Sequence, residues 1–388
     1  MNFTYTGIYL LFLSILVFLS FIEFSLIKEN KNTPFIREIC IFILIIFWAL
    51  RGYISGDAIV YSWHFNTLPS IFSSEFWNYL GLISDKGYTI LMGITRIISD
   101  NYLFFQFCIA LLSIYLLDKA VRQYSKYYVL PVIIFFSFNG LFLGFNLVRN
   151  CVTILIFINS IKYIEEKRFL KFLLINIFGA FIHYSSIIYI LLYPFFKIRI
   201  PIKIYWVVFI IGNVFFLAKI EYIKPILSYL QLLLHGKISE SIQAYLSIGH
   251  ELKPFSITIG FFERLATITI LLFFHRYLSD EKYVNIFYNM LFIYIIGFYF
   301  FGELTNLMSR MMMLFVGFYW FLFPLFYTKL KKTGKKYFLF ILIIICFGKV
   351  FIQVRTPLFK YSNIITGVER FMEYQSRVEK IIYNEQPE

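Results

Sequence analysis

YTGIYLLFLSILVFLSFIEFSLI, residues 5–27, is an apolar run in which Glu23 is the only charged residue. An α-helix rises 1.5 Å per residue, so about 20 apolar residues cross a bilayer core roughly 30 Å thick. No basic segment precedes this run, and it is longer than the apolar part of a cleaved signal peptide. We therefore expect it to form a first transmembrane helix that stays in the mature chain.

Similar apolar runs recur along the rest of the chain. The 388 residues are 60% hydrophobic, 22% aromatic and only 15% charged, which excludes a water-soluble globular protein. We expect an all-α, polytopic transmembrane helical bundle. The predicted spans are residues 5–27, 36–50, 101–118, 128–145, 148–164, 169–182, 184–197, 203–219, 256–275, 284–302, 306–327 and 337–353.

Basic residues gather in every second connection between these runs. The six connections are KENKN, DKAVRQYSK, KYIEEKRFLK, KIRIPIK, HRYLSDEK and TKLKKTGKK. Positively charged loops face the cytoplasm, which predicts about 12 crossings, within a range of 10 to 13, and both termini outside. Because these clusters are short and separated, the formal net charge of +14 reflects topology, and we expect no nucleic-acid partner.

The alternate connections are predicted to be extracytoplasmic, and two of them are long. Residues 51–100 include an amphipathic stretch at 88–98, and residues 220–255 mix apolar and polar residues between prolines and glycines. Both patterns favour interfacial amphipathic helices on the extracytoplasmic side. We divide the chain into an integral membrane domain, residues 1–354, and an amphipathic tail, residues 355–388. The four cysteines are scattered singly, which predicts neither a disulfide framework nor a metal site.

Polar residues at the outward ends of the spans are the candidates for function. Arg51, Asp57 and Tyr61 follow the second span, where two glycines turn the chain. They could bind and process a substrate, whereas the alternative is an arginine at the membrane interface and an aspartate that caps a helix. Arg149 lies with Asn146 and Asn150 in a tight turn between apolar runs, where an arginine is costly unless it has a partner. A bound phosphate would provide that partner.

Two further candidates lie later in the chain. His183 lies at the tip of a hairpin of two short apolar runs, facing the outer side, where it is either a structural residue or a proton acceptor. Glu303 and Arg310 lie near the outer end of a late span. They either contact substrate or form a private ion pair that would leave Arg310 without a ligand.

Four short motifs occur in order on this pattern of spans, and together they resemble the EpsG-like branch of the Wzy-type polysaccharide repeat-unit polymerases. The motif residues are Arg51, Asp57 and Tyr61, then Asn146, Arg149 and Asn150, then Phe181, His183 and Ser185, and finally Ser309 and Arg310. The chain departs from the family pattern at Asn150, where glutamine is usual, at Ile182, which separates Phe181 from His183, and in the absence of a Tyr-Phe pair after Arg310.

The resemblance implies a membrane glycosyltransferase that joins undecaprenyl-diphosphate-linked oligosaccharide repeat units at the periplasmic face of the bacterial inner membrane. The growing glycan would leave its diphosphate lipid and join the sugar end of an incoming unit, with inversion. Arg149, Arg310 and Arg51 would bind the diphosphate, because positive charge stabilises that leaving group. Either His183 or Asp57 would accept the proton, and Tyr61, Asn146, Asn150 and Glu303 would contact substrate.

This reaction requires no metal or cofactor, and its expected partners are the lipid-linked oligosaccharide, the bilayer, a flippase and a chain-length regulator. The main rival from another class is a flippase for the same lipid-linked units. A flippase should carry charges along a path through the whole membrane, whereas here they gather on one side. An O-antigen ligase, which transfers finished polymer to another acceptor, is a second rival.

Overall fold

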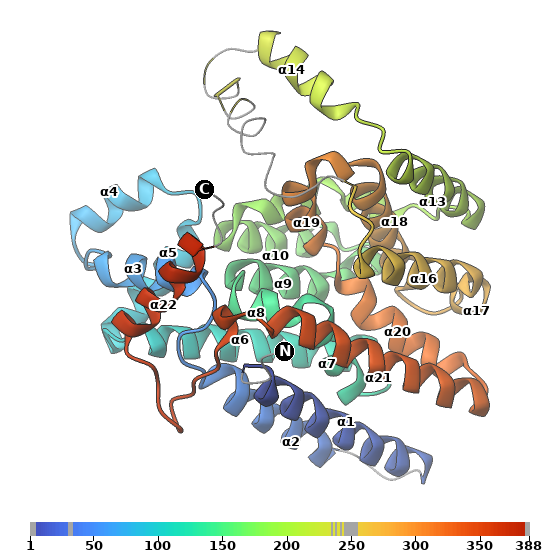
Figure 1. The fold of residues 1–388 in the computed structure, drawn as a ribbon, viewed down its shortest axis with the longest axis horizontal. Coiled ribbons are helices and arrows are strands. Elements are labelled where there is room, and N and C mark those ends of the chain that lie inside the picture. The colour runs from blue at the N-terminus through green and yellow to red at the C-terminus, as the bar shows by residue number, and fades with distance from the viewer. Residues whose placement is uncertain are drawn as a thin grey trace. The chain divides into compact units, whose positions relative to one another are not determined.

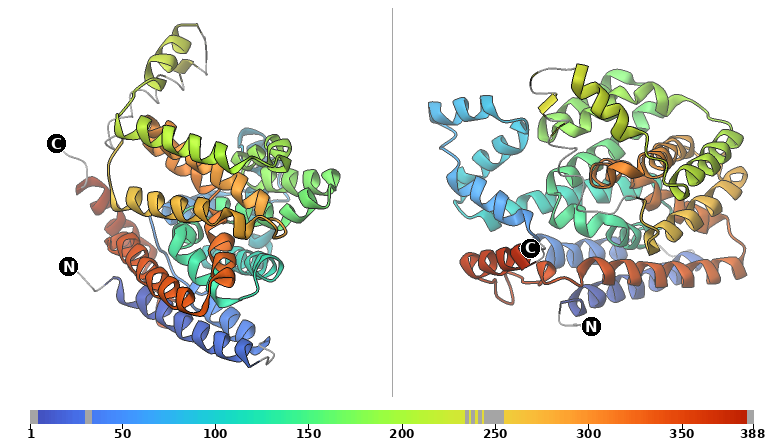
Figure 2. Two further views of the ribbon diagram at one scale, coloured as in Figure 1. Left: turned by 90° about the vertical axis from the view of Figure 1, so that its right-hand side faces the viewer. Right: turned by 45° about the horizontal axis from the view of Figure 1, so that its top comes forward.

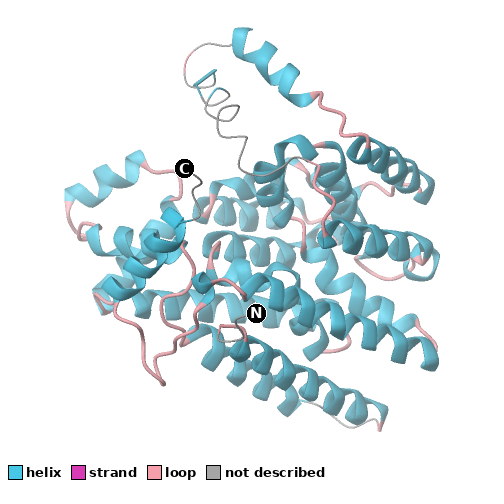
Figure 3. Cartoon of the chain, viewed as in Figure 1, coloured by secondary structure: helices cyan, strands magenta, loops and turns pink. Residues whose placement is uncertain are grey.

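The computed structural model describes residues 5–29, 34–233, 236, 239–240, 243 and 255–384. Within these residues the regular structure is helical and no β-strand forms (Figure 3). Isolated bridges join Asn363 to Arg51 and to Gly367. The predicted all-α fold class is confirmed.

The chain forms two compact units. The first contains Met1–Tyr193 and Tyr319–Glu388, and the second contains Pro194–Phe318. The first unit holds α1 (Gly7–Lys28), α2 (Pro34–Leu44), η1 (Ile45–Ala49), α3 (Asp57–Thr67), α4 (Ser74–Leu82), α5 (Lys86–Ile98), α6 (Tyr102–Tyr124), α7 (Val129–Phe135), η2 (Phe136–Gly140), α8 (Leu141–Phe145), α9 (Val148–Glu165), α10 (Phe169–Ile182), η3 (Tyr184–Ile187), α11 (Ile188–Leu191), α21 (Lys332–Val354), η5 (Pro357–Phe359) and α22 (Phe371–Asn384).

The second unit holds α13 (Ile202–Leu217), α14 (Ile223–Leu233), α16 (Ile259–Phe273), α17 (His275–Leu278), α18 (Val284–Phe300), η4 (Gly302–Leu304) and α19 (Thr305–Met313). Two helices, α12 (Tyr193–Lys197) and α20 (Gly317–Lys329), contain the boundaries between the units.

Several helices are long and apolar enough to cross a membrane. Among the described residues, α1, α6 and α21 meet that condition alone, and Leu307–Met313 with Gly317–Lys329 make a fourth if they count as one broken span. Further apolar stretches of 10–17 residues occur at Val129–Phe145, Phe169–Ile182, Ile202–Leu217 and Val284–Phe300. The protein is therefore a helical, multi-pass membrane protein.

Helical structure occupies every one of the predicted spans, with boundaries close to those expected from hydropathy. Some spans are interrupted. The span predicted at 128–145 is divided into α7, η2 and α8 because Asn139 adopts a positive φ of 71°. The carbonyl of Phe138, released from the helix there, accepts a hydrogen bond of 3.1 Å from Trp320 Nε1. A side chain from elsewhere in the unit thus satisfies the backbone group that the break exposes.

The centre of the first unit is α9, which is buried on nearly all of its faces from Cys151 to Ile161. A helix that is apolar all round is stable only when it is surrounded, and α9 packs against α6, α8 and α10. Helices α1 and α21 lie side by side in the same unit (Figures 1 and 2). The first turn of α9, which carries Arg149, therefore has a rigid base.

The segment predicted to contain an interfacial helix at 88–98 forms α5, preceded by α3 and α4. Caps explain where these helices begin: Ser73 Oγ accepts from the backbone N–H of Phe76 at 3.3 Å, which starts α4. In the second unit, α14 covers part of the predicted amphipathic stretch 220–255. Residues 234–235, 237–238, 241–242 and 244–254 of that stretch lie outside the described residues.

The tail packs onto the loop that leads into α3. The backbone N–H of Gly52 donates to Ser362 O at 2.8 Å, and that of Ser55 donates to Leu358 O at 3.0 Å. Tyr374 on α22 is buried against Ala58. The predicted amphipathic tail helix is present as α22, and it contributes to the position of the start of α3.

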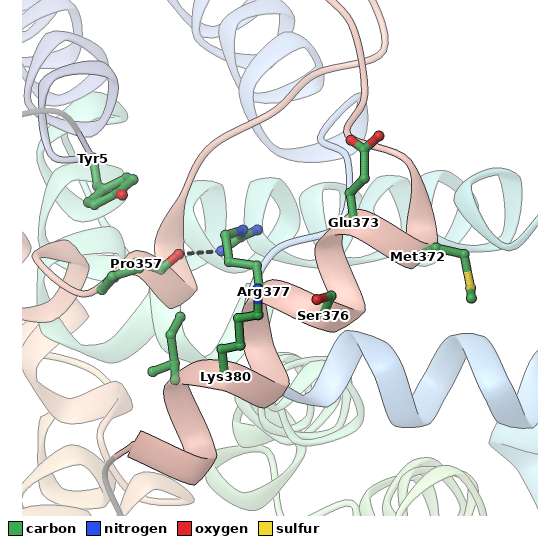
Figure 4. A pocket seen from close by; sticks show the side chains of 8 residues that line it. Tyr5, Pro357, Met372, Glu373, Ser376, Arg377 and Lys380 are labelled. Carbon is green, nitrogen blue, oxygen red and sulfur yellow. Dashed lines mark hydrogen bonds between the residues drawn. The ribbon is translucent and has the colours of Figure 1, made fainter.

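An open hollow of about 660 Å³ lies beside the tail (Figure 4). Its lining residues are Tyr5, Pro357, Met372, Glu373, Ser376, Arg377, Lys380 and Ile381. Figure 4 shows the Arg377 guanidinium turned to the carbonyl oxygen of Pro357, to which it donates. A second nitrogen of the guanidinium donates to Glu369 at 2.7 Å. These bonds join α22 to η5, and none of the sequence-predicted site residues lines this hollow.

Candidate functional site

Asp85 is the residue at which three distant segments of the first unit meet. Its carboxylate accepts hydrogen bonds from Arg149 Nη1 and, at 3.1 Å, from the backbone N–H of Tyr184. The Nδ1 atom of His183 lies 3.1 Å from both oxygens of the same carboxylate. Arg149 and His183 are 64 and 98 residues from Asp85 in the sequence. The fold therefore brings two of the predicted site residues to one acidic group.

The ends of α9 and α10 explain this convergence. Arg149 lies in the first turn of α9, and His183 immediately follows the last residue of α10, with an extended backbone of φ −148° and ψ 115°. The two helices are consecutive and pack side by side, joined by a 2.9 Å hydrogen bond from Asn176 Nδ2 to Ser160 Oγ (Figure 1). The start of one and the end of the other consequently lie at the same end of the pair.

Two tyrosines flank the Arg149 guanidinium. Its central carbon lies 5.2 Å from the centre of the Tyr61 ring and 5.8 Å from that of Tyr88. Aromatic faces attract a cation, so these rings help hold the guanidinium in place. The Arg149 side chain is nevertheless 34% exposed, compared with 9% for Asp85 and 15% for His183. Arg149 can therefore reach a ligand without leaving Asp85.

The environment of Asp85 keeps its carboxyl ionised. Burial by itself would raise the pKa of Asp85, but the hydrogen bonds from His183 and the Tyr184 backbone and the charge of Arg149 together hold that pKa below its ordinary value. A carboxyl with a lowered pKa stabilises the folded site at all pH values above the ordinary aspartate pKa of about 3.9. That contribution is lost only as the pH falls through the lower folded-state value.

Three other predicted residues lie on the same unit but make different contacts. The backbone N–H of Asp57 lies 3.4 Å from Asn146 Oδ1, so the start of α3 is joined to the turn before α9. The backbone carbonyl of Asn150 accepts a hydrogen bond of 3.1 Å from Thr153 Oγ1. Their roles in substrate binding or proton transfer stay predictions.

Arg51 is placed differently from Arg149. It is 2% exposed, donates to the backbone carbonyls of Trp48 (2.8 Å) and Gly144 (3.0 Å), and lies over the Phe145 ring at 4.7 Å. This guanidinium crosslinks the turn after η1 to α8. The geometry favours a structural contribution, and the diphosphate role predicted for Arg51 stays a prediction.

We expect Arg51→Met to destabilise the protein without removing activity per folded molecule. Methionine fills much of the space but cannot donate, so the Trp48 carbonyl loses this partner, at a cost of about 1–3 kcal/mol. Thermal unfolding in detergent measures the first effect, and polymer yield normalised to folded protein measures the second, for the polymerase activity that the motifs imply. Lost polymer at unchanged thermal stability would instead support diphosphate binding by Arg51.

Glu303 and Arg310 belong to the second unit. The Glu303 carboxylate accepts hydrogen bonds from the backbone N–H groups of Tyr222, Ile223 (2.8 Å) and Lys224 (3.0 Å). The carboxylate thereby caps the start of α14. Arg310 is an exposed residue of α19. The structure records no ion pair between them among the residues that it describes. Substrate binding by Glu303 and diphosphate binding by Arg310 stay predictions.

Sequence reasoning missed Asp85 and Tyr88. Asp85 directly precedes an amphipathic stretch, where an aspartate usually caps the helix that follows. In the structure Asp85 is at the N-cap position of α5, yet its side chain makes no capping hydrogen bond with α5. Asp85 is one of four carboxylates in the predicted extracytoplasmic connection 51–100, with Asp57, Glu75 and Asp100, and only its long-range contacts distinguish it.

Gly87 allows α5 to approach α10 closely beside this site. A Cβ atom at Gly87 would lie 2.8 Å from the backbone oxygen of Phe181 and 2.6 Å from its ring. Backbone atoms cannot rotate away, so Gly87→Ala must move α5, which carries Asp85, relative to α10 and His183. A displacement of about 1 Å in an active site can cost roughly 10²-fold in rate.

For the polymerase activity that the motifs imply, we expect Gly87→Ala to reduce polymer formation by about 10²-fold, measured per inserted protein. Gly81→Ala is the matched control, because a Cβ atom at Gly81 in α4 meets nothing within 4 Å. Equal activity of the two variants would show that the spacing between Asp85 and His183 does not matter.

Comparisons with known proteins give a single family. No curated protein and no solved structure matches the chain. The family model described as EpsG family matches residues 35–375, which include the predicted motifs and all residues of the Asp85 cluster. That range is most of the 388 residues, and the chain belongs to the EpsG family.

Proposed function

We propose that this protein is a glycosyltransferase that polymerises lipid-linked oligosaccharide repeat units. Membership of the EpsG family suggests a role in exopolysaccharide biosynthesis. The observation that carries the finer proposal is the convergence of Arg149 and His183 on Asp85. A cation for a diphosphate and an imidazole for a proton lie within one cluster, as glycosyl transfer from a diphosphate donor requires.

The proposed reaction begins when a hydroxyl of the incoming unit attacks the anomeric carbon of the growing glycan. A new glycosidic bond forms, and the bond from that carbon to the lipid diphosphate breaks, with its electron pair leaving on the diphosphate. His183 accepts the hydroxyl proton, and Arg149 stabilises the charge on the leaving group. Attack opposite the leaving group inverts the anomeric centre.

Of the two predicted proton acceptors, His183 is supported better than Asp57. His183 Nδ1 is held by a carboxylate, the usual means of orienting a catalytic imidazole. Asp57 lies at the start of α3, where its backbone N–H contacts Asn146. We assign proton transfer to His183, and Tyr61, beside Arg149, to substrate contact.

We propose about 12 crossings, with the Asp85 cluster on the periplasmic side of the inner membrane. The cluster residues lie in or directly beside the three connections at 51–100, 146–148 and 183, which alternate with the basic loops. The undecaprenyl chain would then lie in the outer leaflet. Arg310 is proposed as a second diphosphate-binding cation, and a flippase and a chain-length regulator as partners.

Deletion of the gene followed by gel display of surface polysaccharide tests the proposal. We expect material capped with single repeat units, restored to a ladder by the wild-type gene. Complete loss of repeat units from the surface would indicate a flippase. Full-length polymer that stays on its lipid carrier would indicate a ligase. Either result would contradict polymerisation.

A further inference from the structure

The bonding pattern at Asp85 fixes which nitrogen of His183 carries a proton. The carboxylate has three neighbours that approach it with nitrogen atoms: Arg149 Nη1, the backbone N–H of Tyr184 and His183 Nδ1. An ionised carboxylate can only accept hydrogen bonds. The proton of a neutral imidazole must therefore lie on Nδ1, which leaves the lone pair on Nε2, on the far side of the ring from Asp85.

The location of Asp85 also separates this role from ordinary helix capping. Asp85 is the N-cap residue of α5, where its side chain would normally accept from the first turn of that helix. The side chain makes no such bond and instead contacts residues at the ends of α9 and α10. A side chain that makes no local bond and instead has three long-range partners points to a role in holding those partners.

We propose that Asp85 is the positioning residue of the site: it fixes the Nδ1–H tautomer of His183, so that Nε2 is the atom that accepts the substrate proton, and it holds Arg149 beside that imidazole. The catalytic part of this inference rests on the proposed function. When Nε2 takes the proton of the acceptor hydroxyl, His183 becomes positively charged, and Asp85 stabilises that charge without itself being protonated.

The Asp85 carboxylate connects the residue that accepts the proton, His183, with the residue that stabilises the leaving group, Arg149. Proton acceptance by His183 and departure of the diphosphate beside Arg149 occur on either side of one anomeric carbon. Because Asp85 bonds to both side chains, their separation is set by a single group carried on α5, whose packing against α10 at Gly87 is tight. The side chains of Arg149 and His183 are therefore already positioned relative to each other before the substrate binds.

Purified protein reconstituted in proteoliposomes, with a lipid-linked repeat unit as substrate, tests the catalytic part. We expect Asp85→Asn to lower kcat by about 10²- to 10⁴-fold, the range of general-base catalysis, with a much smaller change in KM. Asparagine is close in shape but can donate to Nδ1, which moves the imidazole proton to Nε2. Asp85→Glu keeps the charge and should recover part of the rate.

Asp100→Asn is the matched control, because Asp100 belongs to the same extracytoplasmic connection, is 78% exposed and pairs with Arg96. It should keep the wild-type kcat. Unchanged kcat in Asp85→Asn, or equal loss in Asp85→Asn and Asp85→Glu without a change of tautomer, would overturn the inference.

Nitrogen NMR of ¹⁵N-histidine-labelled protein reads the tautomer directly, with the His183 signal identified by its loss in His183→Gln. We expect Nδ1–H in the wild type and Nε2–H in Asp85→Asn. An Nε2–H tautomer in the wild type would overturn the inference without any variant of Asp85. The spectrum needs no substrate, so if the wild type makes no polymer, the proposed function fails while the inference about His183 is still decided.

Discussion

His183→Ala is expected to lower polymerisation by about 10²- to 10⁴-fold, the contribution of a positioned general base. The imidazole belongs to the residue that follows the last residue of α10, so its loss removes a proton acceptor without a substitution inside the helix. Asp85 keeps its bonds to Arg149 and to the Tyr184 backbone. The measurement is the rate of chain elongation per inserted protein.

His275→Phe is the control for this variant. His275 lies on α17 of the second unit, in a loop predicted to be cytoplasmic, and its ring packs 4.6 Å from that of Tyr288. Phenylalanine keeps the ring and removes the imidazole, so normal elongation is expected. Wild-type elongation by His183→Ala would exclude His183 as the base.

Arg149→Ala is expected to lower elongation by about 10²- to 10³-fold, the typical loss when one charge-stabilising donor is removed from an active site. The guanidinium is the partly exposed cation of the Asp85 cluster, held between that carboxylate and the rings of Tyr61 and Tyr88. Removing this guanidinium also removes a positive charge beside Asp85, so the pKa of Asp85 should rise toward its ordinary value.

Arg149→Lys separates charge from geometry. Lysine keeps the positive charge but lacks the planar fork that can bond a carboxylate and a phosphate together, so partial recovery is expected. Arg168→Ala is the control, because Arg168 is 57% exposed and lies in a loop predicted to be cytoplasmic. Equal elongation by Arg149→Ala and Arg168→Ala would contradict a role for Arg149 in leaving-group stabilisation.

Hydropathy and charge were sufficient to predict the long apolar helices of this chain, but not α3, α4 or the break at Asn139. The boundaries of α9 and α10 follow from where apolar runs end, and they place Arg149 and His183 at the turns of consecutive helices. It can therefore be inferred from the sequence that Arg149 and His183 lie at the same end of the antiparallel helix pair α9 and α10. The sequence therefore predicted part of the site.

Asp85 could not be predicted in the same way, because its partners are determined by how α5 packs against α10 and not by local pattern. The same limit applies to Arg51 and Glu303. Both are polar residues at span ends, yet they are buried at 2% and 6% exposure and bonded to backbone groups. A sequence shows where a charge occurs along the chain, whereas burial depends on contacts between distant segments.

The most direct test of the central claim, that Arg149, Asp85 and His183 form the active site of a repeat-unit polymerase, is elongation by the purified protein in proteoliposomes. The substrate is an undecaprenyl-diphosphate-linked repeat unit. The measured quantities are the length of the glycans formed and the amount of undecaprenyl diphosphate released. We expect a ladder of glycans with one diphosphate lipid released per new linkage, and loss of both in His183→Ala and Arg149→Ala. A wild-type protein that forms no ladder, or variants that form the wild-type ladder, would contradict the claim.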